Sequence, residues 1–137
     1  MKIGHIALSV SNIDRSTGFY RKNFGFKCSK KYWLKSLGLK ICIIKKDNVA
    51  LELFEFKKHK PLPKYRKNLE SDLVTLGTKH FAFAVEDIER TYKKLKKSSV
   101  RFMTDMRVFE NSLKFFFIKD PDGILVEIME EETGGRL

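Results

Sequence analysis

Long hydrophobic runs are missing from this chain of 137 residues. No stretch approaches the roughly 20 apolar residues that a helix needs to cross a bilayer, so we expect no membrane partner. The N-terminus also lacks the basic region followed by an apolar core that marks a signal peptide. With 42% hydrophobic and 33% charged residues, the composition is typical of a globular protein, and we expect a cytoplasmic one.

Cysteine is scarce, and the two that occur, Cys28 and Cys42, do not form a CxxC motif. Neither has a spacing typical of a zinc site. In a chain without export features, two reduced and partly buried thiols are the expected state. A single disulfide between them is the alternative.

Acidic residues are outnumbered, with 17 Asp and Glu against 28 Lys and Arg and a net charge of +11. Such a balance can attract nucleic acid, acidic lipid or an anionic small molecule. The lysines are spread along the chain, and no recognition-helix or RNA-binding motif accompanies them. We therefore expect a solvated basic surface and no nucleic-acid partner, although an anionic substrate would still be attracted by the positive field.

What the chain does contain is an internal repeat with an offset of 75 residues. Residues 4–22 align with residues 79–97 without a gap, and further identities follow downstream. Duplication of one unit explains this better than chance. The identical pairs are His5/His80, Ala7/Ala82, Val10/Val85, Ile13/Ile88, Arg15/Arg90, Lys22/Lys97, Asp47/Asp122, Glu52/Glu127 and Glu55/Glu130.

Each copy is expected to form strand, helix and three strands, an α+β unit. Asn12 and Asp87 are predicted helix caps, Gly25 a helix end, and Asp47-Asn48 and Asp122-Gly123 hairpin turns. The predicted modules are 1–56 and 79–131, joined by linker 57–78 and followed by a short C-terminal tail. Predicted elements are Ile3–Val10, Ile13–Asn23, Lys27–Trp33, Leu39–Lys45, Val49–Phe56, a linker helix Tyr65–Leu73, then His80–Val85, Ile88–Ser98, Arg101–Arg107, Leu113–Lys119 and Ile124–Glu130.

Strand alternation places both repeated histidines on the face opposite the packed residues. In the first strand Ile6, Leu8 and Val10 share the face that packs under the helix, whereas His5 shares its face with the small residues Ala7 and Ser9. His80 is likewise followed on its face by Ala82 and Ala84. Bulky side chains fill a core face, so small neighbours indicate a cleft.

The repeated glutamates follow the same rule. Glu52 lies between Leu51 and Leu53, and Glu127 lies between Val126 and Ile128. A carboxylate in the middle of an apolar strand is costly to bury without a partner. One strand His or one such Glu is usually an ordinary structural residue, but four at matched repeat positions favour a shared metal site.

His5, Glu52, His80 and Glu127 are therefore the predicted metal ligands. Two neutral imidazoles and two carboxylates balance the charge of one divalent cation, with Ni, Zn or Co preferred and Fe or Mn as alternatives. Four protein ligands on an octahedral ion leave two positions for water or substrate, the open site that catalysis requires.

With these residues in place, the chain resembles the vicinal oxygen chelate superfamily. That group holds glyoxalase I, fosfomycin-resistance proteins, extradiol dioxygenases, methylmalonyl-CoA epimerase and bleomycin-resistance proteins. The resemblance covers nearly the whole chain. It rests on the stretches GHIALSVSNIDRSTGFYRKNFGF, VALELFEF, KHFAFAV and KDPDGILVEIME.

The resemblance implies two tandem βαβββ modules that form a curled, U-shaped mixed sheet around a metal. It also places His5, Glu52, His80 and Glu127 on the four family ligand positions. Homodimers are common in the family, and some members build each site from two chains. The shared chemistry is chelation of a substrate through adjacent oxygens, with the metal acting as a Lewis acid.

A complete His-Glu-His-Glu set is most similar to glyoxalase I, which isomerises the hemithioacetal of methylglyoxal and glutathione. By that resemblance Glu127 is the expected base, with Glu52 as the second carboxylate. Ser9 and Phe56 replace an arginine and an asparagine often found in bacterial glyoxalase I, which argues against glutathione. Ser9, Phe54 and Phe56 are the candidate substrate contacts, and Trp33 is expected near them in an apolar pocket.

Other functions found in the family remain as alternatives. An acyl-CoA epimerase uses similar proton chemistry, with Lys64, Arg66 and Lys67 as candidate phosphate contacts. An Fe(II) extradiol dioxygenase, like fosfomycin-type thiol transfer, uses three protein ligands, and Glu52 would fill a position needed there. A metal-free resistance or binding protein lacks the ligand set and captures a cationic drug, which this basic chain does not suit. We therefore expect a metal-dependent lyase or isomerase acting on an anionic, thioester or hemithioacetal substrate.

Overall fold

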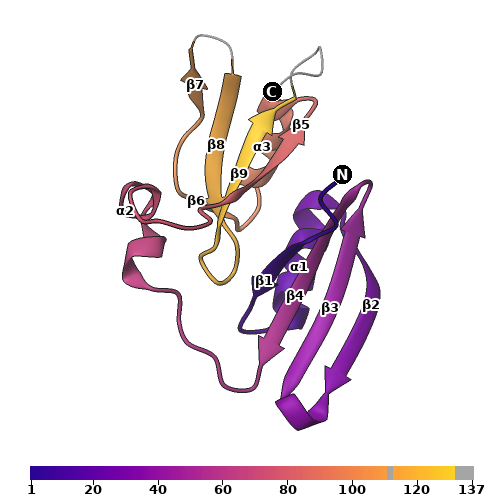
Figure 1. The fold of residues 1–137 in the computed structure, drawn as a ribbon. Helices are drawn as coiled ribbons and strands as arrows, with labels where there is room; N and C mark the ends of the chain where they lie inside the picture. Colours follow the sequence, from indigo (N-terminus) through magenta and orange to yellow (C-terminus); the bar gives the residue numbers. More distant parts are fainter. Residues whose placement is uncertain (111–112, 132–137) are drawn as a thin grey trace. The chain divides into compact units, whose positions relative to one another are not determined.

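The computed structural model describes residues 1–110 and 113–131. The chain divides into two compact units, Met1–Pro61 and Leu62–Leu137, each with its own mixed sheet (Figure 1). The expected C-terminal tail after residue 131 lies outside the described residues. Within them, no helix has the length and apolar character needed to span a membrane. The predicted α+β class is confirmed.

The first unit follows the predicted order of strand, helix and three strands. Its sheet has the order β1-β4-β3-β2, with β1 parallel to β4 and the other pairs antiparallel. A 3-10 turn, Lys35–Leu37, joins the second and third strands. The elements are β1 Ile6–Ser9, α1 Ile13–Phe24, β2 Lys27–Leu34, β3 Leu39–Lys46 and β4 Val49–Phe56.

Helix α1 is held at both ends. The Asn12 side chain accepts a hydrogen bond from the Arg15 N–H at 2.8 Å, and the Glu55 carboxylate accepts one from the Ile13 N–H at 2.7 Å. Gly25 ends the helix with a φ of 78°, a left-handed conformation that costs glycine little. The caps predicted at Asn12 and Gly25 are confirmed, and Glu55 adds a tie from β4.

The core of the first unit lies between α1 and one face of its sheet. Leu51 and Leu53 of β4 are fully buried, as are Cys42 and Ile44 of β3. On β1, Leu8 is buried whereas Ala7 and Ser9 are exposed. The alternation predicted from the sequence is confirmed, so Glu52 lies on the face away from the helix.

The second unit repeats this plan. Its sheet has the order β5-β9-β8-β6, with β7 also paired to β8, and β5 runs parallel to β9. Asp87 caps the helix by accepting from the Arg90 N–H at 2.8 Å, as predicted. The elements are η2 Lys64–Lys67, α2 Leu69–Leu73, β5 Phe81–Val85, α3 Ile88–Lys96, β6 Arg101–Phe102, β7 Arg107–Phe109, β8 Leu113–Lys119 and β9 Leu125–Glu130.

The single strand predicted over Arg101–Arg107 is wrong, because the chain forms two short strands there. The N–H groups of Met103 and Thr104 both donate to the Phe117 carbonyl, at 2.8 and 3.3 Å. The Thr104 hydroxyl then accepts from the Phe117 N–H at 3.0 Å. Since this side chain takes the place of a backbone ladder partner, pairing stops at β6 and resumes at β7.

Asp122 and Gly123 lie in the hairpin turn between β8 and β9, as predicted, but the connection is longer than a two-residue turn. The last β8–β9 pair is Lys119 with Leu125, which leaves five residues between the strands. Buried Asp120 organises this loop, since its carboxylate accepts from the Asp122 and Ile124 N–H groups, both at 2.9 Å. In the first unit, Asp47-Asn48 does form the predicted two-residue turn between Lys46 and Val49.

The linker helix α2 covers part of the second sheet. Leu69 of α2 packs in one buried cluster with Phe117 and Leu125, and Phe115 and Met103 pack against that cluster. Phe117 and Leu125 share the sheet face of Glu127, because Phe117 is the register partner of Glu127. Part of the predicted linker helix therefore forms and packs over this face.

Replacing Asp120 tests the loop that precedes Glu127. We expect Asp120→Ala to lower the free energy of unfolding by about 2 kcal/mol, because two backbone N–H groups lose their buried acceptor. Urea unfolding monitored by circular dichroism measures this change. The control Asp14→Ala removes a carboxylate that is 87% exposed and should have a smaller effect. Equal effects would contradict the capping role.

Glu55 predicts a pH dependence of stability. The hydrogen bond from Ile13 N–H, followed by that from Lys40, lowers the pKa of Glu55 from its usual 4.5. Its stabilising contribution is therefore present above about pH 5 and is lost as pH falls through the lowered folded pKa. The stability difference between wild type and Glu55→Gln should shrink between about pH 5 and pH 3.

The matched control for Glu55 is Glu70→Gln, which removes an exposed carboxylate on α2. Urea unfolding at several pH values should show a difference from wild type that varies less for this variant. A pH-independent difference for Glu55→Gln would contradict the assignment.

Candidate metal centre

Each repeated histidine lies one residue before a strand. Strands β1 and β5 start at Ile6 and Phe81, slightly later than the predicted starts at Ile3 and His80. His5 precedes β1, whose pairing with β4 begins at Ile6 and Leu51. His80 precedes β5, whose pairing with β9 begins at Phe81 and Val126. The two histidines therefore occupy equivalent positions in their units.

The glutamates lie next to them by register. Ala7 is the parallel partner of Glu52, and Ala82 is the parallel partner of Glu127. Each histidine is two residues before that alanine, so it leans over the same face of the sheet. The small alanine side chains leave room for the imidazole to reach the carboxylate.

The result is one His–Glu pair in each unit. His5 Nε2 lies 3.2 Å from Glu52 Oε2, and His80 Nε2 lies 3.0 Å from Glu127 Oε2. All four predicted ligands are thus engaged in equivalent contacts. Among the residues the structure describes, no three His, Cys, Asp or Glu side chains gather as a ready-made metal cluster.

The two pairs differ in exposure. The His5 side chain is 54% exposed, whereas that of His80 is 24% exposed. Phe117 accounts for part of this difference, because its ring lies edge to face with the His80 ring at a centroid distance of 4.9 Å. Leu69 and Phe115 pack with Phe117 in the same cluster, and the repeat alone did not single out these residues.

The two ring nitrogens of His80 have different surroundings. Its Nδ1 is buried and has no hydrogen-bond partner among residues 1–110 and 113–131, while Nε2 faces the Glu127 carboxylate. The chemistry of this side chain is therefore concentrated at Nε2, the atom that a metal ligand would use.

The nitrogen–oxygen separation within each pair fits two neighbouring ligands on a metal ion. With metal–ligand bonds of about 2.1 Å, neighbouring ligands at right angles lie about 3.0 Å apart. The observed 3.2 and 3.0 Å agree with that geometry. Imidazole nitrogen with carboxylate oxygen is also a donor set that transition metals accept. Each pair thus fits two adjacent positions on a divalent ion.

The chain leading to His80 is anchored by basic residues of the linker. Arg66 Nη2 donates to the carbonyls of Thr78 and Lys79, at 2.8 and 3.2 Å. The Lys79 ammonium donates to the carbonyls of Asp72 and Thr75, and Asp72 itself is buried. Arg66, which the sequence suggested as a phosphate contact, is thus engaged in holding the residues before His80.

The candidate substrate contacts lie on the Glu52 side of the first sheet. Ser9 and Phe54 are register partners on β1 and β4, and Phe56 follows at the end of β4 with 40% exposure. Their role stays a prediction. The placement of Trp33 beside them is wrong, because Trp33 pairs with Lys40 and Lys40 with Glu55, on the helix side of the sheet.

Trp33 instead lines a cavity of about 350 Å³ beside the start of α1, together with Lys40 and Glu55. Tyr32 is the β2 residue in register with Phe54, since Tyr32 pairs with Ile41 and Ile41 with Phe54. Strand alternation shows that Tyr32 and Trp33 lie on opposite faces of the sheet. Which of them lies on the Phe54 face depends on the β2–β3 register, which the sequence did not define.

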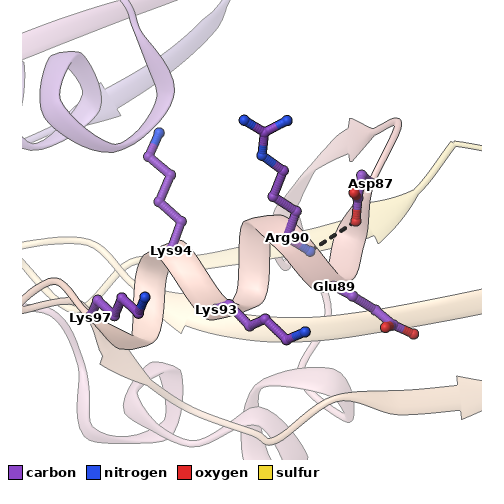
Figure 2. A pocket seen from close by; sticks show the side chains of 6 residues that line it. All are labelled: Asp87, Glu89, Arg90, Lys93, Lys94 and Lys97. Atoms are coloured by element: carbon purple, nitrogen blue, oxygen red, sulfur yellow. Dashed lines mark hydrogen bonds between the residues drawn. The ribbon is translucent and has the colours of Figure 1, made fainter.

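A cavity of about 550 Å³ lies along α3 and contains none of the four predicted ligands. Figure 2 shows its cationic side chains projecting from α3, and all four of these residues are exposed. Arg90, Lys93, Lys94 and Lys97 follow helical spacing, and Asp87 and Glu89 complete the lining. This agrees with the solvated basic surface expected from the composition.

The positive charge is concentrated in the first unit. Residues 1–61 contain 14 Lys and Arg against 4 Asp and Glu, a net charge of +10. Residues 62–137 contain 14 against 13, a net charge of +1. The field of the first unit therefore favours anionic small molecules.

Comparison with known proteins adds a family. The profile of the Glyoxalase/Bleomycin resistance protein/Dioxygenase superfamily matches residues 2–128. The protein YaeR of Escherichia coli is 28% identical over 132 residues, covering 95% of this chain and 96% of its own length. The mitochondrial methylmalonyl-CoA epimerase of Mus musculus is 23% identical over 131 residues, covering 93% of this chain and 71% of its own.

Solved structures share the fold. A glyoxalase family protein from Enterococcus faecalis superposes with a TM-score of 0.80 at 27% identity, covering 94% of this chain and 97% of its own. Glyoxalase I from Zea mays superposes with a TM-score of 0.77 at 21% identity, covering 95% of this chain and 44% of its own. The likeness to the maize enzyme is one of fold.

Metal titration of the apoprotein tests the two pairs. Wild type should bind about one divalent ion per chain. His5→Ala and His80→Ala should each weaken binding to that same site by at least about 100-fold, because losing a ligand costs more than losing an outer-shell contact. Calorimetry with Ni²⁺ and Zn²⁺ measures both affinity and stoichiometry.

The control is His59→Ala, which removes the third histidine and should bind like wild type. Two ions per chain, with each variant losing one of them, would contradict a shared site. Wild-type affinity in both variants would contradict the ligand assignment itself.

Proposed function

Because this chain belongs to the Glyoxalase/Bleomycin resistance protein/Dioxygenase superfamily, we propose that it is a metal-dependent lyase or isomerase that moves a proton next to a carbonyl group. The observation that carries this proposal is the pair of equivalent contacts, His5 with Glu52 and His80 with Glu127. The sheet register of each unit brings a histidine and a carboxylate together on the same face.

We propose that the two pairs hold one divalent cation, with ligands from one chain or from two chains of a homodimer. Ni, Zn or Co suit this donor set, with Fe or Mn as alternatives. When bound, such a cation would act as a Lewis acid toward a carbonyl oxygen of the substrate.

The proposed base is Glu127. Its side chain is 17% exposed, and Phe117 flanks it by register on β8. Partial exclusion of water around a carboxylate strengthens its interaction with a nearby proton donor. Glu52, which is 22% exposed in its unit, would serve as the second carboxylate. Glu127 would take the proton from the carbon beside the carbonyl and return it to an adjacent position.

One substrate candidate is a hemithioacetal, as in the glyoxalase I reaction. The four-residue ligand set supports it. Ser9 and Phe56, however, offer no charge to a glutathione carboxylate. Phe54 and Phe56, with Tyr32 on the same face, present apolar and aromatic surface instead.

The second candidate is an acyl-CoA thioester, which the epimerase relative favours. Epimerisation requires the same removal and return of a proton beside a carbonyl. The net charge of +10 on residues 1–61 suits the phosphates of coenzyme A. The glyoxalase-type and epimerase-type reactions therefore differ in the substrate and share the role of Glu127.

Proton exchange in D₂O separates these possibilities. The metal-loaded protein is incubated either with methylmalonyl-CoA or with the hemithioacetal of methylglyoxal and glutathione, and nuclear magnetic resonance follows the proton beside the carbonyl. Exchange with one substrate alone identifies the reaction. Absence of exchange with both would contradict the proposed reaction type for these substrate classes.

Glu127→Gln should slow this exchange by about 10²- to 10⁴-fold, the usual contribution of a general base. The amide keeps the shape of the side chain, so circular dichroism should be unchanged, and metal content is measured on the same sample. The control Glu89→Gln alters a side chain that is 57% exposed on α3 and should retain full exchange. Unchanged exchange in metal-loaded Glu127→Gln would rule out this base.

A further inference from the structure

The thiols of Cys28 and Cys42 have no part in the proposed reaction, yet they lie in contact. Their Sγ atoms are 3.2 Å apart, close enough that either thiol can donate a hydrogen bond to the other. Both cysteines are reduced. They are also the two cysteines of the whole sequence, so any disulfide within one chain must join them.

An irregularity in the sheet brings them together. Cys28 on β2 pairs with Ile44 on β3, while Lys31 pairs with Cys42, and the register shifts between Cys28 and Lys30. Three steps along β2 therefore match two steps along β3. A bulge of this kind increases the local twist and redirects side chains. Here it leaves the Cys28 side chain diagonally next to that of Cys42.

The two thiols have different surroundings. Cys28 is exposed on the edge strand β2, whereas Cys42 is fully buried beneath α1. Burial, followed by the contact with Cys28, raises the pKa of Cys42 to about 11. An exposed thiol is accessible to a dissolved oxidant, and a buried one is not. Cys42 Sγ nevertheless lies beside Cys28 Sγ, the atom that would be oxidised first.

We propose that Cys28 and Cys42 are a redox-active pair that hydroperoxides convert to a disulfide between β2 and β3. The Cys28 thiolate attacks the terminal peroxide oxygen, so that an S–O bond forms and the O–O bond breaks; the other oxygen leaves, after protonation, as an alcohol, or as water when the oxidant is hydrogen peroxide. Cys42 sulfur then attacks Cys28 sulfur, forming the S–S bond and releasing a water that carries the Cys42 proton. Two thiols are oxidised by two electrons and one peroxide is reduced.

The disulfide would covalently attach the edge strand β2, which is otherwise hydrogen-bonded along one side. Strand β2 pairs with β3 alone in its sheet, and all eight of its residues are exposed. Ile43 next to Cys42 is the register partner of Glu52. Oxidation would thus link β2 covalently to β3, the strand that pairs with β4 at Glu52. It closes a loop between residues 14 positions apart, which raises the melting temperature of the oxidised form.

Peroxide oxidation of the full-length protein tests the pair. Treatment with hydrogen peroxide should take the number of free thiols per chain from two to none. The intact mass of the monomer should fall by about 2 Da. A peptide linking Cys28 to Cys42 should appear on digestion, and a dithiol reductant should restore both thiols.

Serine variants test the order of the two steps. Cys42→Ser should lose its remaining thiol to peroxide and react with a sulfenic-acid trap. Cys28→Ser should keep its buried thiol far longer under the same conditions. Equal rates in the two variants would overturn Cys28 as the attacking group.

Three outcomes in the wild type would overturn the pair itself. These are two thiols that persist, Cys28 oxidised by added oxygen while Cys42 stays free, and a disulfide that joins two chains. Denatured protein treated in parallel controls for proximity, because the native chain should form the link faster than the chain in urea.

Discussion

The candidate site depends on one constraint, the parallel pairing of β1 with β4 and of β5 with β9. This pairing buries apolar residues on either side of a glutamate, Leu51 and Leu53 in one unit and Val126 and Ile128 in the other. Because strand residues alternate, the carboxylate between them must emerge on the opposite face. The same register places a small alanine beside each glutamate and a histidine two residues earlier. A shift by one residue would turn both glutamates into the core, where unpaired charge is costly.

Around this shared frame the two copies have diverged. The second hairpin is longer and is organised by buried Asp120, whereas the first turns through two residues. The second sheet also carries the linker helix, whose Leu69 packs with Phe117 over the Glu127 face. His80 is less exposed to solvent than His5, and because its Nδ1 is buried, Nε2 is the ring nitrogen that faces the carboxylate. The two units therefore contain similar His–Glu pairs, and local packing leaves the second pair less exposed than the first.

What could be predicted from the sequence follows from how local each feature is. The faces of Leu51, Glu52 and Leu53 depend on strand alternation alone, and the caps at Asn12 and Asp87 depend on a few neighbouring atoms. Trp33 was misplaced because its face depends on the β2–β3 register, which contains a shift that composition does not announce. The break after β6 was missed for a similar reason. The Thr104 hydroxyl can replace a backbone hydrogen-bond acceptor in the sheet only when Phe117, 13 residues away, lies opposite it.

Each His–Glu contact also bears on what a bound metal would do for the fold. In each pair the histidine Nε2 lies 3.0–3.2 Å from the glutamate Oε2, so each carboxylate has a polar partner within its own unit. The apolar layer beneath the sheets is complete without a cation, since Leu51, Leu53, Val126 and Ile128 are fully buried. A metal held by these side chains would take the place of the direct contact in each pair, and its ligands would bind it in their deprotonated forms. Its contribution would therefore be mainly chemical, unlike that of a structural zinc site, whose binding drives folding.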